Sequence, residues 1–342
     1  MIGKMFLSIG TAILAFVLEA GNSSGPAKII FDTDMYTDFD DVGALACLHA
    51  LADEGKCEIL ATVSSTRGTP SVGVCQAINA WYGRGDIPVG APREIGITAP
   101  ETPRYAYPIY QRLVGERPEF CQSSDEAPDA NAVYRRVLAG QPDGSVTVCS
   151  VGFMTNLRRL LETRGDEFSP LSGKELVARK VRAWYAMACR YPDGKEYNSS
   201  RDAESSRIVL RDWPTPVYFV DWWLGGAVRC GVPVSKVSCE RNPVARVFRE
   251  ALRDFGETEK GHPAWDQVTV LAAVGGLGMD FGAERGLFRI AGADGRNEWT
   301  ADRDGRHRRL YALTPVRELA YRIDELMARA PNAVSKDKKE RK

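Results

Sequence analysis

Five aspartates lie within ten residues near the start of the chain, in the segment FDTDMYTDFDD: Asp32, Asp34, Asp38, Asp40 and Asp41. Carboxylates this close repel one another, so the loop needs a cation or raised pKa values to be stable. Oxygen ligands without a neighbouring Cys or His indicate a hard cation such as Ca²⁺ or Mg²⁺. The EF-hand pattern fits poorly, because Thr37 stands where that loop needs Gly and Gly43 where it needs Glu. The alternative is a solvated acidic loop that caps the next helix.

The elements around this loop alternate between short apolar runs and longer helical patterns. The sequence predicts strands at 28–32, 58–65, 87–90, 145–152, 183–189 and 216–223, and helices at 42–55, 72–82, 130–138, 155–164 and 202–211. An antiparallel ribbon is expected from 286–291 and 308–313, before a last helix over 316–328. Because the apolar runs are continuous, the strands are expected to be buried on both faces, which predicts an α/β fold with a mostly parallel sheet flanked by helices. Ligands in such sheets bind at the carboxyl ends of the strands, where the aspartates stand.

Composition limits the remaining possibilities. The 342 residues contain 45 Lys+Arg and 45 Asp+Glu, and a net charge of zero argues against a nucleic-acid binder. With 44% hydrophobic and 26% charged residues, the chain has an ordinary globular composition. We expect one domain over residues 27–330.

Both ends of the chain are predicted to lie outside this domain. Lys4 is followed by an uncharged stretch over residues 6–18 and then by small residues, which is the pattern of a secretory signal over residues 1–20. The stretch is too short to span a bilayer of about 30 Å comfortably, so we expect a secreted or periplasmic protein without a stable membrane anchor. A short buried N-terminal helix is the alternative. Residues 331–342 are basic, lack an apolar anchor and predict a disordered tail.

Four ordered segments resemble motifs of the inosine-uridine type nucleoside hydrolases. The D-x-D loop runs into an Asp-Asp pair and an apolar helix. The segment GFMTNL (152–157) resembles the family's glycine-x-x-Thr-Asn motif, and EYNSSRDAESSRIVL (196–210) resembles its Glu-Phe-Asn segment. The segment WDQVTVLAAV (265–274) resembles the late helix that opens with a metal-binding Asp. The resemblance covers about residues 28–274.

This resemblance implies a Rossmann-like nucleoside hydrolase fold and Ca²⁺-dependent hydrolysis of the N-glycosidic bond of ribonucleosides to base and ribose. The implied metal ligands are Asp34, Asp41, Asp266 and the Thr155 carbonyl, with Asp34 also as the base that takes a proton from water. Asp40, Glu196 and Asn198 are the implied ribose-binding residues. Three carboxylates and a carbonyl leave room for water and two sugar hydroxyls in a Ca²⁺ shell of roughly 6 to 8 oxygens. The implied partner is a small-molecule ribonucleoside, and the oligomeric state stays open.

The acidic loop departs from the family pattern. Six positions separate Asp34 from Asp40, where the family has four, and Asp38 is an additional acid. Asp38 is therefore an alternative to Asp40 as the sugar-binding residue. Thr69 stands where many members have an Asn.

Trp265 replaces the His that many members place directly before the last metal-binding Asp. A Trp stands there in the purine-preferring branch, so the resemblance implies stacking of Trp265 on a purine. His262 is the alternative proton donor for the leaving base, but the following Pro263 predicts an extended, outward-facing position for it.

Two other functions are compatible with these residues. A strand followed by D-x-D also opens the haloacid-dehalogenase-like Mg²⁺-dependent phosphatases, although Met35, Tyr36 and the pair Asp40 and Asp41 fit that pattern poorly. A secreted, non-catalytic binder of sugars or nucleosides that depends on Ca²⁺ is the second alternative.

Overall fold

The computed structural model describes residues 25–98, 105–238 and 240–332. The predicted signal segment 1–20 and residues 333–342 of the predicted tail 331–342 lie outside the described residues. Within the described ranges, no helix is long and apolar enough to cross a membrane.

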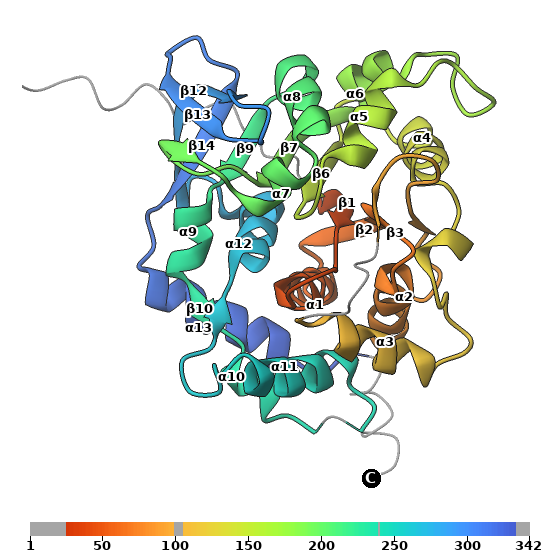
Figure 1. Ribbon diagram of the computed structural model, residues 1–342, viewed down its shortest axis with the longest axis vertical. Coiled ribbons are helices and arrows are strands. Elements are labelled where there is room, and N and C mark those ends of the chain that lie inside the picture. The colour runs from red at the N-terminus through yellow and green to blue at the C-terminus, as the bar shows by residue number, and fades with distance from the viewer. Residues whose placement is uncertain (1–24, 99–104, 239, 333–342) are drawn as a thin grey trace, which may run out of the picture.

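A ten-stranded sheet forms the centre of the protein (Figure 1). Its strands in spatial order are β4 (Val89–Gly90), β2 (Cys57–Ser64), β1 (Ala27–Thr33), β6 (Val146–Ser150), β7 (Val181–Met187), β9 (Val217–Val220), β14 (His307–Ala312), β12 (Phe281–Ile290), β13 (Asn297–Ala301) and β8 (Asp193–Gly194). All pairs from β4 to β14 are parallel, whereas β12, β13 and β8 continue the sheet in antiparallel pairs. The predicted α/β class with a mostly parallel sheet is therefore confirmed.

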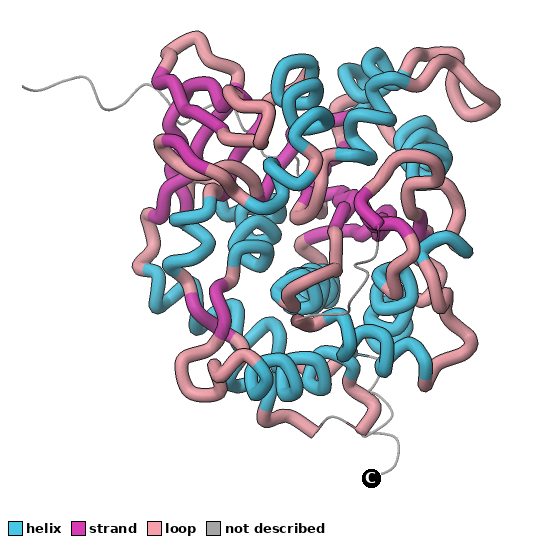
Figure 2. Tube along the Cα trace, viewed as in Figure 1, coloured by secondary structure: helices cyan, strands magenta, loops and turns pink. Residues whose placement is uncertain are grey.

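Helices cover both faces of this sheet (Figure 2). They are α1 (Asp40–Asp53), α2 (Ser71–Trp81), α3 (Tyr107–Gly115), α4 (Ala130–Ala139), α5 (Thr155–Glu162), α6 (Gly173–Lys180), α7 (Tyr197–Arg201), α8 (Ala203–Asp212), α9 (Trp222–Ala227), α10 (Val232–Ser235), α11 (Pro243–Asp254), α12 (Trp265–Leu271) and α13 (Val316–Ala328). Side chains of β1 alternate between two cores. Ile29 and Phe31 pack with α1, α11, α12 and α13, whereas Ile30 packs with α4, α5, α6 and α8. Burial on both faces explains why the strands are continuously apolar.

The strand order reverses between β1 and β6. The chain builds β1, β2 and β4 toward one edge, and then β6, β7 and β9 on the other side of β1. A crevice at the carboxyl ends of the strands is expected at such a switch point. The loop after β1 carries Asp34, and the loop after β6 carries Gly152, so the predicted site residues meet there.

The predicted strand 216–223 is shorter than expected. It ends at Val220, because the Asp221 carboxylate accepts hydrogen bonds from the backbone N of Trp223 and of Leu224 and so begins α9. An aspartate after an apolar run is a strong helix cap, and this signal outweighs the aromatic residues that follow it. The two tryptophans therefore belong to a helix.

Candidate active and metal site

Three buried carboxylates meet where α1 packs against α12. Asp40 and Asp41 open α1, and Asp266 is the second residue of α12. One carboxylate oxygen from each lies within 4.8 Å of the others. The backbone N of Asp266 donates to Asp40 Oδ2 at 3.2 Å, which ties the two helix starts together. Because these side chains are buried, the alternative of a solvated acidic loop is wrong.

Asp41 has one satisfied and one unsatisfied oxygen. Its Oδ1 accepts hydrogen bonds from the Thr33 hydroxyl and from the backbone N of Met35. Met35 has a φ of 37°, a left-handed conformation that is costly for a residue other than Gly. Asp41 Oδ2 is buried and has no hydrogen-bond partner among the described residues. A buried carboxylate oxygen without a partner is costly, so this atom fits a bound hard cation.

The carboxylates of this cluster repel one another. Burial raises the pKa of Asp34, Asp40 and Asp266 well above the usual range, and repulsion between the carboxylates adds to the effect. The pKa of Asp41 rises to about 7, first through burial and then through the nearby Asp38. The neighbouring charges that act most strongly on Asp34, Asp40, Asp41 and Asp266 are those of other aspartates. A cation or bound protons must therefore balance them.

Asp32 does not belong to this cluster. Its carboxylate accepts hydrogen bonds from the Tyr134 hydroxyl at 2.8 Å and from Asn156 Nδ2 at 3.2 Å. Burial raises its pKa to about 7. The period of two along β1 could have shown this, because Asp32 shares a face with Ile30, which packs in the other core. The compact group of five aspartates in the sequence is thus divided by the fold, and Asp266 joins the rest.

The loop after β6 is pressed against Asp34. A Cβ atom on Gly152 would lie 2.3 Å from the backbone N of Asp34, so only glycine allows this approach. Thr155, three residues on, is buried at the start of α5, and its hydroxyl donates to the carboxylate of Asp202, the cap of α8. The predicted metal residues Asp34 and Thr155 therefore come from loops that are in direct contact.

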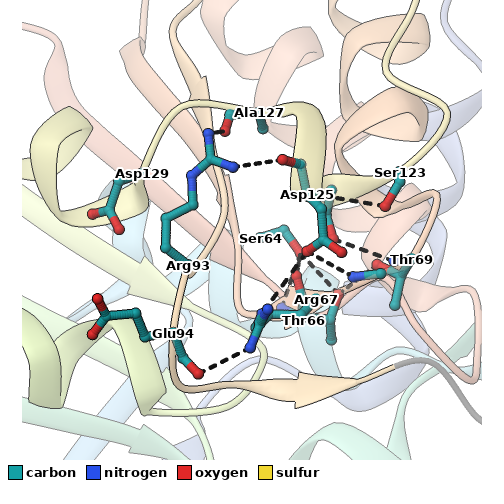
Figure 3. A network of polar contacts seen from close by, with 12 residues as sticks. Ser64, Thr66, Arg67, Thr69, Arg93, Glu94, Ser123, Asp125, Ala127 and Asp129 are labelled. Carbon is teal, nitrogen blue, oxygen red and sulfur yellow. Dashed lines mark hydrogen bonds and ion pairs between the residues drawn. The ribbon is translucent and has the colours of Figure 1, made fainter.

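A network of polar side chains that includes Ser64, Thr66 and Thr69 lies just after β2 (Figure 3), and it reaches the backbone of Asp34. Thr66 Oγ1 donates to the Asp34 carbonyl at 3.2 Å and lies 2.8 Å from Thr69 Oγ1. Thr69 also donates to Ser71 Oγ at 2.8 Å. Thr69 is thus part of a buried network that supports the site. Sequence analysis missed Thr66, although the run of Ser and Thr after β2 is visible.

Glu196 is engaged with its own surroundings. It caps α7, and its carboxylate accepts hydrogen bonds from the backbone N of Asn198 at 2.6 Å and of Ser199 at 2.9 Å. The backbone N of Cys189 at 3.1 Å and the Ser199 hydroxyl at 2.9 Å complete the set. These four donors hold the carboxylate in a fixed orientation at the end of β7.

Asn198 links the ends of two central strands. Its Nδ2 donates to the carbonyl of Val151 at 3.0 Å and to the carbonyl of Met187 at 3.2 Å. The neighbouring Tyr197 is partly exposed, and the charge of Asp34 contributes to a raised pKa of Tyr197, after the larger effect of burial. This segment therefore lies beside the acidic loop.

Trp265 opens α12 and is half-buried against α9. Its Nε1 donates to the carbonyl of Trp222 at 2.8 Å. A Cβ atom on Gly225 would lie 2.5 Å from the Trp265 Cδ1, and one on Gly226 would lie 3.1 Å from Nε1. Because these two glycines of α9 have no side chains, the indole packs directly against the helix, which fixes its orientation.

His262 points inward, so its predicted outward-facing position is wrong. Its side chain is buried, and one ring nitrogen lies within 4.8 Å of oxygens from Asp38 and Asp40. Pro263 does keep the backbone extended, but that extended segment pairs as β11 (His262–Pro263) with β10 (Arg229–Cys230). This pairing directs the ring toward Phe39, whose centroid is 4.2 Å away.

Comparison of this structure with known proteins identifies the fold to which the chain is similar. No protein-family model and no curated protein matches the sequence. A plant nucleoside hydrolase is similar in structure, with a TM-score of 0.64 and 19% identity over 89% of this chain and 99% of that one. The inosine-uridine preferring nucleoside hydrolase from Bacillus anthracis has a TM-score of 0.64 and 15% identity, over 88% of this chain and 99% of that one. The type III effector protein XopQ, complexed with adenosine diphosphate ribose, has a TM-score of 0.63 and 16% identity, over 90% of this chain and 94% of that one. The chain therefore has the fold of the nucleoside hydrolases across nearly its whole length, with a divergent sequence.

Proposed function

We propose that this protein binds one Ca²⁺ at the carboxyl ends of β1 and β6 and hydrolyses the N-glycosidic bond of ribonucleosides to base and ribose. One observation carries the proposal. Buried carboxylates, including the unpartnered Asp41 Oδ2, converge at the switch point of a sheet whose fold is shared with nucleoside hydrolases.

The residues that would hold the ion are Asp34, Asp41, Asp266 and the carbonyl of Thr155. All four residues are buried and offer oxygen, which is the ligand type that Ca²⁺ prefers. When bound, Ca²⁺ lowers the pKa of a coordinated water and fixes the direction from which this water attacks.

Asp34 would accept the proton of the attacking water. Its carboxylate stands at the end of β1, and its backbone is held by Thr66 and by the close approach of Gly152. Without an ion, burial and neighbouring charges raise the pKa of Asp34, and a bound Ca²⁺ would lower it again. A positioned base contributes about 10² to 10⁴ in rate.

Asp40 and Asn198 are the proposed contacts to the ribose hydroxyls. Asp40 stands at the start of α1, and Asn198 stands in the first turn of α7. Glu196 is the third proposed ribose residue, although four hydrogen bonds already hold its carboxylate. Its first effect is therefore to position Asn198. Asp38 remains the alternative to Asp40.

Release of free ribose from a panel of inosine, adenosine, uridine and cytidine tests this function. We expect activity that chelation abolishes and Ca²⁺ restores. Asp34→Ala should lose about 10⁴-fold or more in kcat, since the base and a metal ligand disappear together. Asp304→Ala, in an exposed turn, is the control and should match the wild type.

Two results would overturn the proposal. Ribose release by Asp34→Ala at the wild-type rate would show that the base lies elsewhere, with Asp38 as the next candidate. Hydrolysis of a simple phosphate ester without any ribose release would instead favour the Mg²⁺-dependent phosphatase.

A non-catalytic, Ca²⁺-dependent binder of nucleosides or sugars is the second candidate. The four hydrogen bonds to the Glu196 carboxylate favour it, because they fix this group on its own surroundings and leave only Oε1, which accepts one bond, for a substrate hydroxyl. Calorimetric binding of inosine that depends on Ca²⁺, together with no ribose release over a long incubation, would select the binder.

A further inference from the structure

A histidine nitrogen and two carboxylates converge next to the proposed Ca²⁺ site. One ring nitrogen of His262 and one oxygen each from Asp38 and Asp40 lie within 4.8 Å of one another. Asp40 also belongs to the group formed with Asp41 and Asp266. The two groups therefore share a carboxylate, and His262 and Asp38 are the additional members.

His262 is held from behind by an acid. Its Nδ1 lies 2.5 Å from Glu257 Oε2, and Glu257 forms an ion pair with Arg229 at 2.6 Å. A carboxylate accepts a hydrogen bond, so this contact assigns the proton to Nδ1 and leaves the lone pair of the neutral ring on Nε2. A histidine that donates one N–H to a carboxylate while its other nitrogen is available is typical of a metal ligand.

The available nitrogen has no other use in the described structure. His262 is only 6% exposed, and its Nε2 is buried without a hydrogen-bond partner among the described residues. In the neutral ring with its proton on Nδ1, Nε2 is an acceptor, as are the carboxylate oxygens of Asp38 and Asp40. Three acceptors that face one another are unfavourable unless a cation or a proton joins them.

The backbone fixes this arrangement as firmly as the side chains do. Gly261 has a φ of 70°, and a Cβ there would lie 2.5 Å from the carbonyl O of Cys230. Directly after it, His262 pairs with Cys230 between β11 and β10. The ring also packs on Phe39, which stands between the two aspartates in the chain. His262 is thus locked in place before any ligand binds.

The charge count points in the same direction. The carboxylates of Asp34, Asp38, Asp40, Asp41 and Asp266 carry five negative charges when ionised, and one dication leaves three uncompensated. A second dication reduces the excess to one. The neighbouring charges that act most strongly on Asp34, Asp40, Asp41 and Asp266 are those of other aspartates, so bound protons or a further cation must balance the rest.

We propose that Asp38, Asp40 and His262 form a second divalent-cation site, which takes a transition metal such as Zn²⁺ and lies next to the Ca²⁺ site, with Asp40 between the two ions. Imidazole nitrogen suits Zn²⁺ and related ions, whereas Ca²⁺ selects oxygen alone. Three protein ligands leave a coordination position open for water or for a substrate hydroxyl. The site extends the proposed function, but metal binding does not depend on turnover of a nucleoside.

Metal titration of the full-length protein tests this site. The chelator-treated protein is loaded with Ca²⁺ and then titrated with Zn²⁺ by calorimetry, and both metals are quantified in the washed protein. We expect one further equivalent of Zn²⁺ with the Ca²⁺ retained. His262→Gln and Asp38→Asn should each abolish this equivalent and keep the Ca²⁺. Co²⁺ in place of Zn²⁺ should give a visible absorption band that His262→Gln lacks.

Glu257 provides a graded test, because it orients the ligand without touching the metal. Glu257→Gln should weaken Zn²⁺ binding by about 10- to 100-fold. Glu259→Gln, two residues away and exposed, is the matched control and should leave the affinity unchanged.

Three outcomes would overturn the second site: no Zn²⁺ uptake by the Ca²⁺-loaded wild type, Zn²⁺ that only replaces Ca²⁺, or uptake that persists in both His262→Gln and Asp38→Asn. If His262→Gln fails to fold by circular dichroism, the half-buried Asp38→Asn decides alone. Failure of the proposed function is distinguishable, since it shows as absent ribose release while the second equivalent of metal is still bound.

Discussion

Gly43 lies where α1 packs against α12. One added methyl group at Gly43 tests whether this contact positions the carboxylates of Asp41 and Asp266. A Cβ would lie 2.3 Å from Gln267 Nε2, 2.7 Å from Met327 Sδ and 2.9 Å from Phe248 Cζ. All three side chains are buried, so none can swing into solvent to make room. Overpacking of this kind costs about 1 to 3 kcal/mol, and Gly43→Ala should lose stability in that range.

The same substitution should weaken metal binding. Gln267 directly follows Asp266, so a displaced Gln267 shifts the Asp266 carboxylate relative to Asp41. If this shift relieves about half of a 3 kcal/mol strain, Ca²⁺ binding must reverse the shift and restore that strain. The Kd for Ca²⁺ then rises about tenfold, since 1.4 kcal/mol corresponds to a factor of ten. Stability and metal affinity are therefore expected to fall together.

Urea unfolding in chelator and calorimetric Ca²⁺ titration measure the two effects separately. Gly115→Ala is the matched control, because Gly115 ends α3 and nothing lies within 4 Å of an added Cβ. It should be neutral or stabilising by up to about 1 kcal/mol, since alanine favours helix more than glycine does. If Gly43→Ala were as stable as Gly115→Ala and kept the wild-type Kd, the contact between α1 and α12 would not position the acids.

Three further predictions concern Ca²⁺ binding, stacking of the purine on Trp265 and the dependence of stability on pH. Ca²⁺ at 100 times its Kd should stabilise the wild type by about 2.7 kcal/mol in thermal unfolding, whereas Asp41→Asn should show almost no Ca²⁺-dependent shift. Trp265→Ala should lose about 5- to 150-fold in kcat/KM on inosine and much less on uridine, because only the purine gains a large stacking area, and equal losses on both would refute stacking. Burial lowers the pKa of His49 to about 3. The unfolded chain, with a His pKa near 6.5, therefore binds a proton that the folded protein does not, and stability is lost as the pH falls from about 6.5 toward 3, by about 1.4 kcal/mol per pH unit in the middle of that range. Urea unfolding at several pH values should show a shallower acid loss for His49→Gln than for the wild type.

Elements with strong local signals could be predicted from the sequence. The predicted helix 42–55 is found as α1 (Asp40–Asp53), and the predicted strand 58–65 as β2 (Cys57–Ser64). A central strand needs apolar residues on both faces, so its composition alone identifies it. The short strand β13 was missed, because Asn297–Ala301 is mostly polar and forms at the outer part of the sheet by pairing with β12 and β8.

Long-range partners limited the prediction of the site. Asp32 was grouped with the other acids because its hydrogen-bond partner Tyr134 lies 102 positions away. His262 was expected to face outward because Pro263 defines only the local backbone. Its actual direction depends on Cys230 and Phe39, which pair with it and pack on it from distant segments. Local sequence shows which residues can do chemistry, but not which carboxylates share one site.

Two departures from the nucleoside hydrolase pattern are far apart in the sequence but adjacent in the structure. The longer acidic loop adds Asp38. The segment before Asp266 has Trp265 in place of a His, and its histidine is His262, three residues earlier. Metal-binding atoms of Asp38 and His262 lie within 4.8 Å of each other. An extra carboxylate beside Asp40 is unfavourable by itself, because two unit charges 4 Å apart repel by about 4 kcal/mol at an effective dielectric constant of 20. A neutral imidazole does not relieve this repulsion, whereas a shared proton or a shared cation does. Zn²⁺ uptake by the Ca²⁺-loaded protein, compared with His262→Gln and Asp38→Asn, separates these two possibilities.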